Sequence, residues 1–322
     1  MAAMKYFYEL TVSSSPHAHG NLTTQKIMRD VLIALLPALI GSVYFFGPRA
    51  LLVTAVSAAA CGFFEWLYRK LLHLDSTVYD LSAVVTGVLL AFVCPVTIPL
   101  WCLIIGDFFA IIVVKQLFGG IGKNFMNPAL AARAFMFSWP VLMSSGFQNA
   151  QWVDAVTEAT PLAAMHQGQM PADSLLAMFM GNVGGCVGET SALLLLIGGV
   201  YLLLRKIISL RIPVAYLATV AVIAFVFPMG HDRFVWTAMQ LCSGGLMLGA
   251  FFMATDYVTS PVTKWGQVLF GIGCGAITMI IRYFGGYNEG VSYAILIMNT
   301  CVVLLDKVGR PRKYGVKKEA KA

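Results

Sequence analysis

Charged residues are scarce in this sequence, and their scarcity excludes most soluble folds. Asp, Glu, Lys and Arg make up 11% of its 322 residues, whereas 59% are hydrophobic and the mean hydropathy is +0.79. A soluble domain carries about 25% charged residues. A membrane-spanning helix needs about 20 apolar residues. The composition therefore predicts an all-α polytopic membrane protein with about ten transmembrane helices.

Paired cysteines, a dinucleotide-binding fingerprint and a clustered basic face are also missing. The seven cysteines are scattered singly, which argues against a zinc or iron–sulfur site held by this chain alone. The sequence contains no Gly-x-Gly-x-x-Gly unit, so it gives no indication of NAD binding. The net charge is +7, and the Lys and Arg residues flank apolar segments and cluster at the C-terminus. This distribution is typical of a cytoplasmic anchor beside anionic lipid. We therefore expect membrane lipid, and no nucleic acid, as a partner.

The apolar residues form ten runs that predict membrane helices. These runs cover 31–47, 50–67, 81–97, 99–117, 127–144, 190–204, 212–229, 236–254, 266–284 and 291–306. With both termini cytoplasmic, most Lys and Arg fall on the inner side, as the positive-inside rule requires. The connection 145–189, which has no Lys or Arg, then lies on the outer face. We expect a multi-pass protein of a bacterial or archaeal cytoplasmic membrane.

Two short, similar segments predict that the chain consists of two internal repeats. Leu117-Phe118-Gly119-Gly120 precedes the fifth run, and Tyr283-Phe284-Gly285-Gly286 precedes the tenth. Because five helices is an odd number, the two halves would be inverted across the membrane, an arrangement that commonly encloses a midplane site. The expected organisation is a cytoplasmic segment 1–30, a first repeat 31–144, an outer loop 145–189, a second repeat 190–306 and a basic tail 307–322.

The outer loop contains two candidate site segments. The first is Thr157-Glu158-Ala159-Thr160, directly before Pro161. The second is a Gly-rich run that includes Gly184, Gly185, Glu189 and Thr190 and leads into a helix. Glycines let a backbone approach a ligand closely, and a helix start offers free N–H groups. Close packing of membrane helices explains the glycines equally well, and a Thr before Pro is also an ordinary helix start.

Four further polar residues lie in or beside the apolar runs: Asp107, Asn127, Arg133 and Asp256. A charge at bilayer depth costs roughly 2.5–3.5 kcal/mol, so such side chains tend to face a cavity or a partner. Arg133 is a candidate to steady the phosphate of a cofactor or an anionic redox state of its ring. Asp107 or Asp256 is a candidate for a cation path, and the loop of Asp256 a candidate second cofactor site. Interhelical hydrogen bonds are the alternative explanation for each.

These segments together resemble one membrane-protein family. It contains the D subunit of the Rnf complex and the B subunit of the Na⁺-pumping NADH:quinone reductase. The similarity extends over nearly the whole chain and includes the 119–129, 157–160, 181–193, 255–263 and 283–299 segments. It implies FMN attached through a phosphoester to Thr160. The family often has Gly where Glu158 stands.

The resemblance also implies a function. The chain is expected to act as an electron-transfer subunit, without stand-alone catalysis, in a complex that couples ferredoxin:NAD⁺ oxidoreduction to Na⁺ or H⁺ translocation. The implied partners are subunits C, G, A, E and B and a flavin transferase for maturation. A second, non-covalent flavin such as riboflavin is a further expectation.

A stand-alone channel or secondary transporter remains an alternative from pattern alone. Inverted repeats and few buried charges suit that class as well. A covalent flavin separates the two hypotheses, because a solute channel has no use for one. A purely structural anchor is a third hypothesis, less compatible with membrane-depth carboxylates.

Overall fold

The computed structural model describes residues 23–139, 143, 160–189 and 191–309. Within these ranges every regular element is a helix, apart from an isolated bridge between Pro95 and Cys186. The predicted all-α class is therefore confirmed.

The helices fall into two sets in chain order. The first set is α1 (Thr24–Phe46), α2 (Pro48–Leu71), η1 (Val78–Asp80), α3 (Ser82–Phe92), α4 (Leu100–Phe108) continued by the π-helical η2 (Phe109–Gln116), and α5 (Pro128–Met136). Two short helices follow, α7 (Pro161–His166) and α8 (Leu175–Met180). The second set is α9 (Ala192–Leu204), α10 (Arg211–Val226), α11 (Arg233–Cys242), α12 (Leu246–Leu248) continued by the π-helical η3 (Gly249–Met253), α13 (Lys264–Phe284) and α14 (Val291–Gly309).

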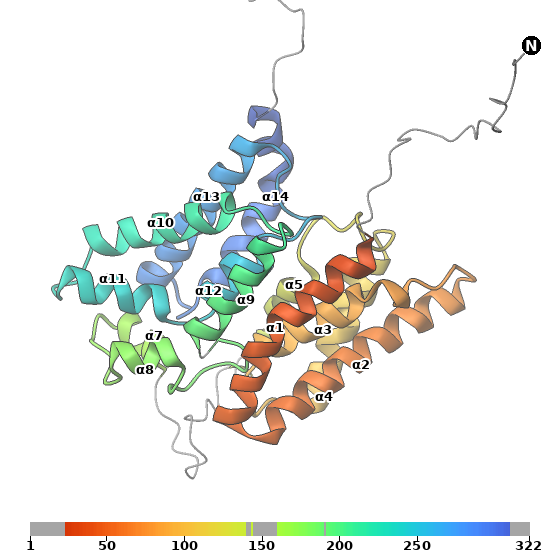
Figure 1. Cartoon of the computed structure of the whole chain (residues 1–322), viewed down its shortest axis with the longest axis horizontal. Helices are drawn as coiled ribbons and strands as arrows, with labels where there is room; N and C mark the ends of the chain where they lie inside the picture. Colours follow the sequence, from red (N-terminus) through yellow and green to blue (C-terminus); the bar gives the residue numbers. More distant parts are fainter. Residues whose placement is uncertain (1–22, 140–142, 144–159, 190, 310–322) are drawn as a thin grey trace, which may run out of the picture.

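The two sets stand beside one another, with α7 and α8 below α11 in the view of Figure 1. Helix α2 packs on α3 and α4, while α10 packs on α11 and α13. Helices α1 and α9 form the main contact between the sets, and α5 packs on α14. These neighbour pairs are those expected of two related halves, and the inversion of one half across the membrane remains a prediction.

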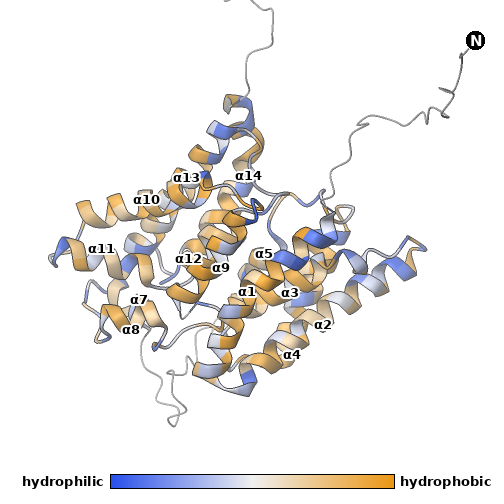
Figure 2. Cartoon of the chain, in the orientation of Figure 1, coloured by the Kyte–Doolittle hydropathy of each residue, from blue (hydrophilic) through white to orange (hydrophobic). Residues whose placement is uncertain are grey.

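The hydropathy of the surface suits a membrane. Four described helices are long and apolar enough to cross a bilayer, namely α1, α2, α13 and α14, and the bent pair α11 and α12–η3 is a fifth candidate. Figure 2 shows apolar residues along the bodies of the helices and polar residues at several of their tips. The chain is a polytopic membrane protein, and the figure of ten crossings stays a prediction.

Three of the predicted apolar runs are shortened or interrupted in the structure. Helix α3 ends at Phe92, because the chain then runs beside the Gly-rich segment, where Gly188 donates its N–H to Phe92 O at 2.8 Å. The run 236–254 is bent by 65° at 243–245. Helix α5 ends at Met136 and is shorter than the predicted run 127–144. The first two interruptions lie beside glycine-rich chain, which hydropathy alone does not register.

Small residues bring helix backbones into direct contact. A Cβ on Gly87 of α3 would lie 2.6 Å from Ser57 O of α2, and one on Gly198 of α9 would lie 2.1 Å from Ala34 O of α1. Lipid offers helices no hydrophobic driving force for association, so close van der Waals packing at small residues carries much of it. The glycines therefore set the spacing of these helix pairs.

Replacing Gly87 with Ala is expected to lower stability, because its Cβ would meet backbone that cannot rotate away. Overpacking of this kind costs about 1–3 kcal/mol. Gly62→Ala in α2 is the matched control, since its Cβ would meet nothing within 4 Å. That change should be neutral or stabilise by about 0.5–1 kcal/mol. Thermal unfolding of the purified protein in detergent measures both, and equal effects would contradict the packing argument.

Candidate functional site

Helix α5 is fixed at its start by Asn127. The Asn127 side chain accepts hydrogen bonds from the N–H groups of Ala129 (3.0 Å) and Leu130 (3.3 Å), and Pro128 occupies the first turn. Asn and Pro at these positions are favourable for starting a helix. The Asn127 amide also donates to Met253 O at 3.3 Å. The start of α5 is thereby joined to the end of η3 in the other set of helices.

Arg133 projects from α5 into a buried cluster of polar groups. Its Nη1 donates to Glu189 Oε1 at 3.1 Å and to Ser292 Oγ at 3.0 Å, and its Nη2 forms an ion pair with Glu289. Nη2 also lies 3.9 Å from Cys186 Sγ. The Arg133 side chain is 5% exposed and that of Glu189 6%. One cation thus joins α5, the Gly-rich segment before α9, and the loop and first turn of α14.

Two carboxylates compete for this single cation. Burial raises the pKa of Glu189, and the neighbouring Glu289 raises it further, while Arg133 lowers it. Glu289 gains a second partner because Gly245 N–H donates to its Oε1 at 2.8 Å. Charges taken out of water must be paired and hydrogen-bonded to be tolerated. This cluster therefore connects three segments of the chain and presents charged groups on one surface.

The cluster forms one side of a cavity of about 320 Å³. That volume lies in the range of about 300–1,000 Å³ typical of ligand pockets. Thr160, Gly184, Gly185, Arg133 and Glu189, which the sequence analysis proposed from separate segments, all line it. The remaining wall includes the apolar and aromatic side chains of Phe137, Met143, Leu162 and Tyr287. The structure therefore brings five of the predicted site residues together.

Thr160 is half-buried at the start of α7. Its hydroxyl accepts a hydrogen bond from the Ala163 N–H at 3.3 Å, so Thr160 caps this short helix. A capping hydroxyl of this kind sits at the edge of the cavity and is available to an incoming group. Glu158 and Thr190 lie outside the described residues.

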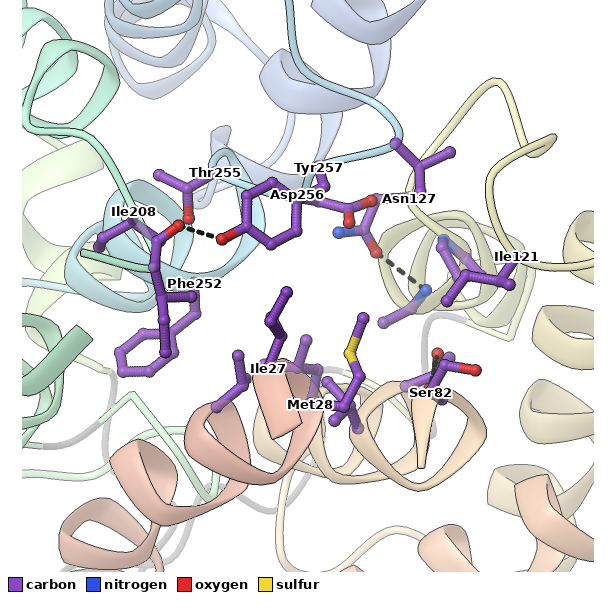
Figure 3. Close-up of a pocket in the computed structure, with 18 of the residues that line it drawn as sticks. Ile27, Met28, Ser82, Ile121, Asn127, Ile208, Phe252, Thr255, Asp256 and Tyr257 are labelled. Carbon is purple, nitrogen blue, oxygen red and sulfur yellow. Dashed lines mark hydrogen bonds between the residues drawn. The ribbon is translucent and has the colours of Figure 1, made fainter. Parts of the chain in front are cut away.

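Asp256 and Asn127 line a different, smaller cavity of about 100 Å³ (Figure 3). The Asp256 carboxylate accepts a hydrogen bond from Thr259 Oγ1 at 3.0 Å. Burial raises the pKa of Asp256, and the hydrogen bonds from Thr259 and the neighbouring backbone lower it. Tyr257 OH donates to Ile207 O across the same region. These two predicted residues thus belong to a second site, separate from the one around Arg133.

Asp107 belongs to neither cavity. It is fully buried in α4, where it lies against Ser57 and Cys61 of α2. The described part of the chain has no group of three or more His, Cys, Asp or Glu side chains arranged to hold a metal ion.

Sequence reasoning missed Glu289 and Ser292 as site residues. Glu289 is partly buried, with 12% of its side chain exposed, between Arg133 and the Gly245 N–H, although it lies in a loop whose sequence is typical of a solvent-exposed turn. The similarity of the two Gly-Gly segments was a signal for the loop that carries Glu289. The first Gly-Gly loop precedes α5, which carries Arg133, and the second precedes α14 and carries Glu289. The similarity marked the second loop as a candidate but did not identify the carboxylate, because the position matching Glu289 in the first loop is Lys123.

Replacing Arg133 with Met should destabilise the protein, because Glu189 and Glu289 would be left buried without their cation. Breaking a buried ion pair in this way costs about 3–5 kcal/mol. Arg133→Lys keeps the charge but loses the forked geometry and should be intermediate. Arg205→Met is the control, because its side chain is 53% exposed in its pair with Asp30. Thermal unfolding in detergent should rank the three losses, and a larger loss at Arg205 would contradict this assignment.

Comparison with known proteins gives the family. The protein-family model described as the NQR2, RnfD, RnfE family matches residues 11–315 of the sequence. The D subunit of the "Na(+)-translocating ferredoxin:NAD(+) oxidoreductase complex" of Acetobacterium woodii is 52% identical over 97% of this chain and 98% of its own length. The D subunit of the "Proton-translocating ferredoxin:NAD(+) oxidoreductase complex" of Clostridium ljungdahlii is 41% identical over 96% and 97% respectively. On these matches, the chain belongs to the NQR2, RnfD, RnfE family.

Proposed function

We propose that this protein is a membrane electron-transfer subunit that carries FMN on Thr160 in a complex coupling ferredoxin:NAD⁺ oxidoreduction to Na⁺ or H⁺ translocation. The names of the two relatives support the type of complex. The observation that carries the flavin assignment is the cavity. Thr160, the Gly-rich segment and Arg133 are separated in sequence, yet they line one space of about 320 Å³.

The residues of the cavity fit a phosphate-tethered aromatic ligand. The Thr160 hydroxyl offers an attachment point that leaves the ring system unmodified. Phe137, Leu162 and Tyr287 offer apolar and aromatic surface, and ligand pockets typically combine such surface with a few polar groups. Arg133 Nε is a buried donor with no hydrogen-bond partner in the described structure. Neighbouring atoms cover it, so a flavin carbonyl or ring nitrogen would satisfy it only after the Arg133 side chain turned toward the cavity.

Charge indicates how the ligand is oriented. The two buried cations described in this region, Arg133 and Arg282, are already balanced by Glu189 and Glu289, so no cation among its described residues is left over for a phosphate. A phosphate diester is anionic and would be repelled from these carboxylates, so we place it at Thr160, with the ring system directed toward Arg133. Bound there, the flavin supplies the electron carrier, and the protein supplies its position and surrounding charge. Arg133 is thus assigned to the ring rather than to the phosphate.

The cellular setting follows from the same proposal. Subunits C, G, A, E and B are the proposed partners, and a flavin transferase attaches FMN. We place both termini in the cytoplasm and the Thr160 loop on the outer face of a bacterial or archaeal cytoplasmic membrane. The N-terminal end of α1 and the C-terminal end of α14 lie toward one side of the molecule, and α7 toward the other (Figure 1). Transporter activity without a redox cofactor is disfavoured, because the similar proteins are named as subunits of oxidoreductases.

Thr160→Ala should remove the covalent flavin completely, because the variant has no hydroxyl to esterify. Ser174→Ala is the matched control. Ser174 caps α8 as Thr160 caps α7, accepting a hydrogen bond from the Ala177 N–H, but it does not line the cavity. Each change removes a helix cap worth about 1 kcal/mol, so stability effects are matched. Peptide mass spectrometry of protein from a host with flavin transferase should find FMN in the control only; an unmodified Thr160 peptide in the wild type would refute the assignment.

We further propose that the loop of Asp256 contributes to a site for a second, non-covalent flavin such as riboflavin. The cavity in Figure 3 opens between α1, α3 and this loop and is lined by apolar side chains such as Met28 and Phe252 together with Asp256 and Asn127. Its volume of about 100 Å³ is below that of usual ligand pockets, about 300–1,000 Å³. Flavin entry would therefore require side chains on α1 or η3 to move.

Asp256→Asn tests this second site. The change keeps the size of the side chain but removes its acid character, so it should reduce the flavin released on denaturation while leaving the flavin on Thr160. Chromatography of the released flavin, with mass spectrometry of the Thr160 peptide as control, measures both. If wild-type complex releases no flavin, the second site does not exist.

A further inference from the structure

Asp107 is a fully buried carboxyl near the middle of a long apolar helix. It is the eighth residue of the continuous helix that runs from Leu100 to Gln116, about 10 Å along the axis from its start at 1.5 Å per residue. The helix changes from α to π geometry directly after it, at Phe109. Such π segments within helices frequently occur at functional sites. Neither the flavin cavity nor the Asp256 cavity includes Asp107.

Asp107 forms one end of a layered contact between α2 and α4–η2. Three residues of α2 spaced one turn apart face three of α4–η2 with the same spacing. At one end Ser57 contacts Asp107, and at the other Glu65 forms an ion pair with Lys115 at 3.0 Å. Between them Cys61 and Ile111 form a small apolar cluster with Ala83. The apolar layer separates Asp107 from Lys115, and no ion pair among the described residues includes Asp107.

Counting protons shows which form of Asp107 the geometry requires. Ser57 Oγ lies 2.9 Å from Gly87 O and 2.6 Å from Asp107 Oδ1. The serine hydroxyl has one proton, so it can donate to only one of these acceptors. An ionised Asp107 could only accept, which would leave one of the two contacts without a proton. A protonated Oδ1 donates to Ser57, and Ser57 then donates to Gly87, so both contacts are satisfied.

The remaining surroundings agree with the neutral carboxyl. Cys61 Sγ lies 3.2 Å from Oδ1 as a weak donor, and Oδ2 has no hydrogen-bond partner in the described structure. A buried carboxylate with an unpartnered oxygen is very unfavourable, whereas a neutral acid with one free carbonyl oxygen is tolerated far better. Hard cations are held by about six or more oxygen atoms. The partners of Asp107 are one hydroxyl, that of Ser57, and one thiol, that of Cys61, which suits a proton rather than a metal cation.

We propose that Asp107 is a proton-binding site that takes part in the ion movement of the complex. In the conformation described, Oδ1 holds the proton and passes its hydrogen bond to Ser57. When α2 and α4 separate at this layer, Oδ1 releases its proton to water on one side of the membrane, and it takes up another proton from water on the opposite side before the helices close again. No electron is transferred in this step. The site does not depend on flavin attachment, so it can be tested separately from Thr160.

Carbodiimide labelling of the assembled complex tests the protonation. A hydrophobic carbodiimide such as dicyclohexylcarbodiimide reacts with protonated carboxyls in apolar surroundings and leaves an adduct that peptide mass spectrometry can locate. We expect an adduct at Asp107 that Na⁺ does not prevent at constant pH. Glu65 is an internal control on the same helix pair: it is paired with Lys115 and hydrogen-bonded by Thr77 and Gln116, so it should stay unlabelled. An unlabelled Asp107, or labelling prevented by Na⁺, would overturn the proposal.

Asp107→Asn tests the role in ion movement. Asn is nearly the same size and can donate to Ser57 as the protonated acid does, so the fold should be retained. Flavin content and thermal unfolding of the purified complex check this directly. We expect ferredoxin-dependent NAD⁺ reduction to continue while ion uptake into inverted vesicles per electron is lost. Asp107→Glu, which keeps the acid, should recover part of the uptake. Uptake equal to the wild type in Asp107→Asn would show that the carboxyl is only structural.

Discussion

One buried cation, Arg133, connects more segments of the polar interior than the cation of any other ion pair described above. Its guanidinium joins Glu189 of the Gly-rich segment, Glu289 of the second Gly-Gly loop and Ser292 of α14. Without it, both carboxylates would lose the cation they are paired with. Because the three segments come from different parts of the chain, the ion cluster forces the loops against the ends of α5 and α14. The cavity stays open because the ion pairs with Arg133 hold these loops in position.

The remaining polar residues follow the same rule in a different form. The Glu65–Lys115 pair and the Asp107–Ser57 contact hold α2 against α4–η2, while Asn127 ties α5 to η3. Elsewhere the helices approach through glycine, as Gly87 and Gly198 do. Glycine contacts thus set the spacing of the helices, and the few polar layers contain the groups that could take part in chemistry. Function in such a protein is concentrated where burial is most costly.

The sequence allowed the helical class, most apolar segments and five cavity residues to be predicted, because hydropathy and glycine content act locally. Thr160, Arg133 and Glu189 were proposed separately and were found to line one cavity. The breaks after Phe92 and at 243–245 were not predicted, since they depend on contacts with distant glycine-rich chain. Glu289 was missed for the same reason. Its burial results from pairing with Arg133, 156 residues away in sequence.

The central claim is that the cavity beside Arg133 holds a flavin attached to Thr160. A cryo-electron microscopy map of the assembled complex tests it most directly. The account predicts density continuous with Thr160 Oγ that extends through a phosphate into the cavity and ends in a planar ring system against Phe137 or Tyr287, within reach of Arg133 Nε. A map with no density on Thr160 and the cavity filled by lipid or by side chains would contradict it.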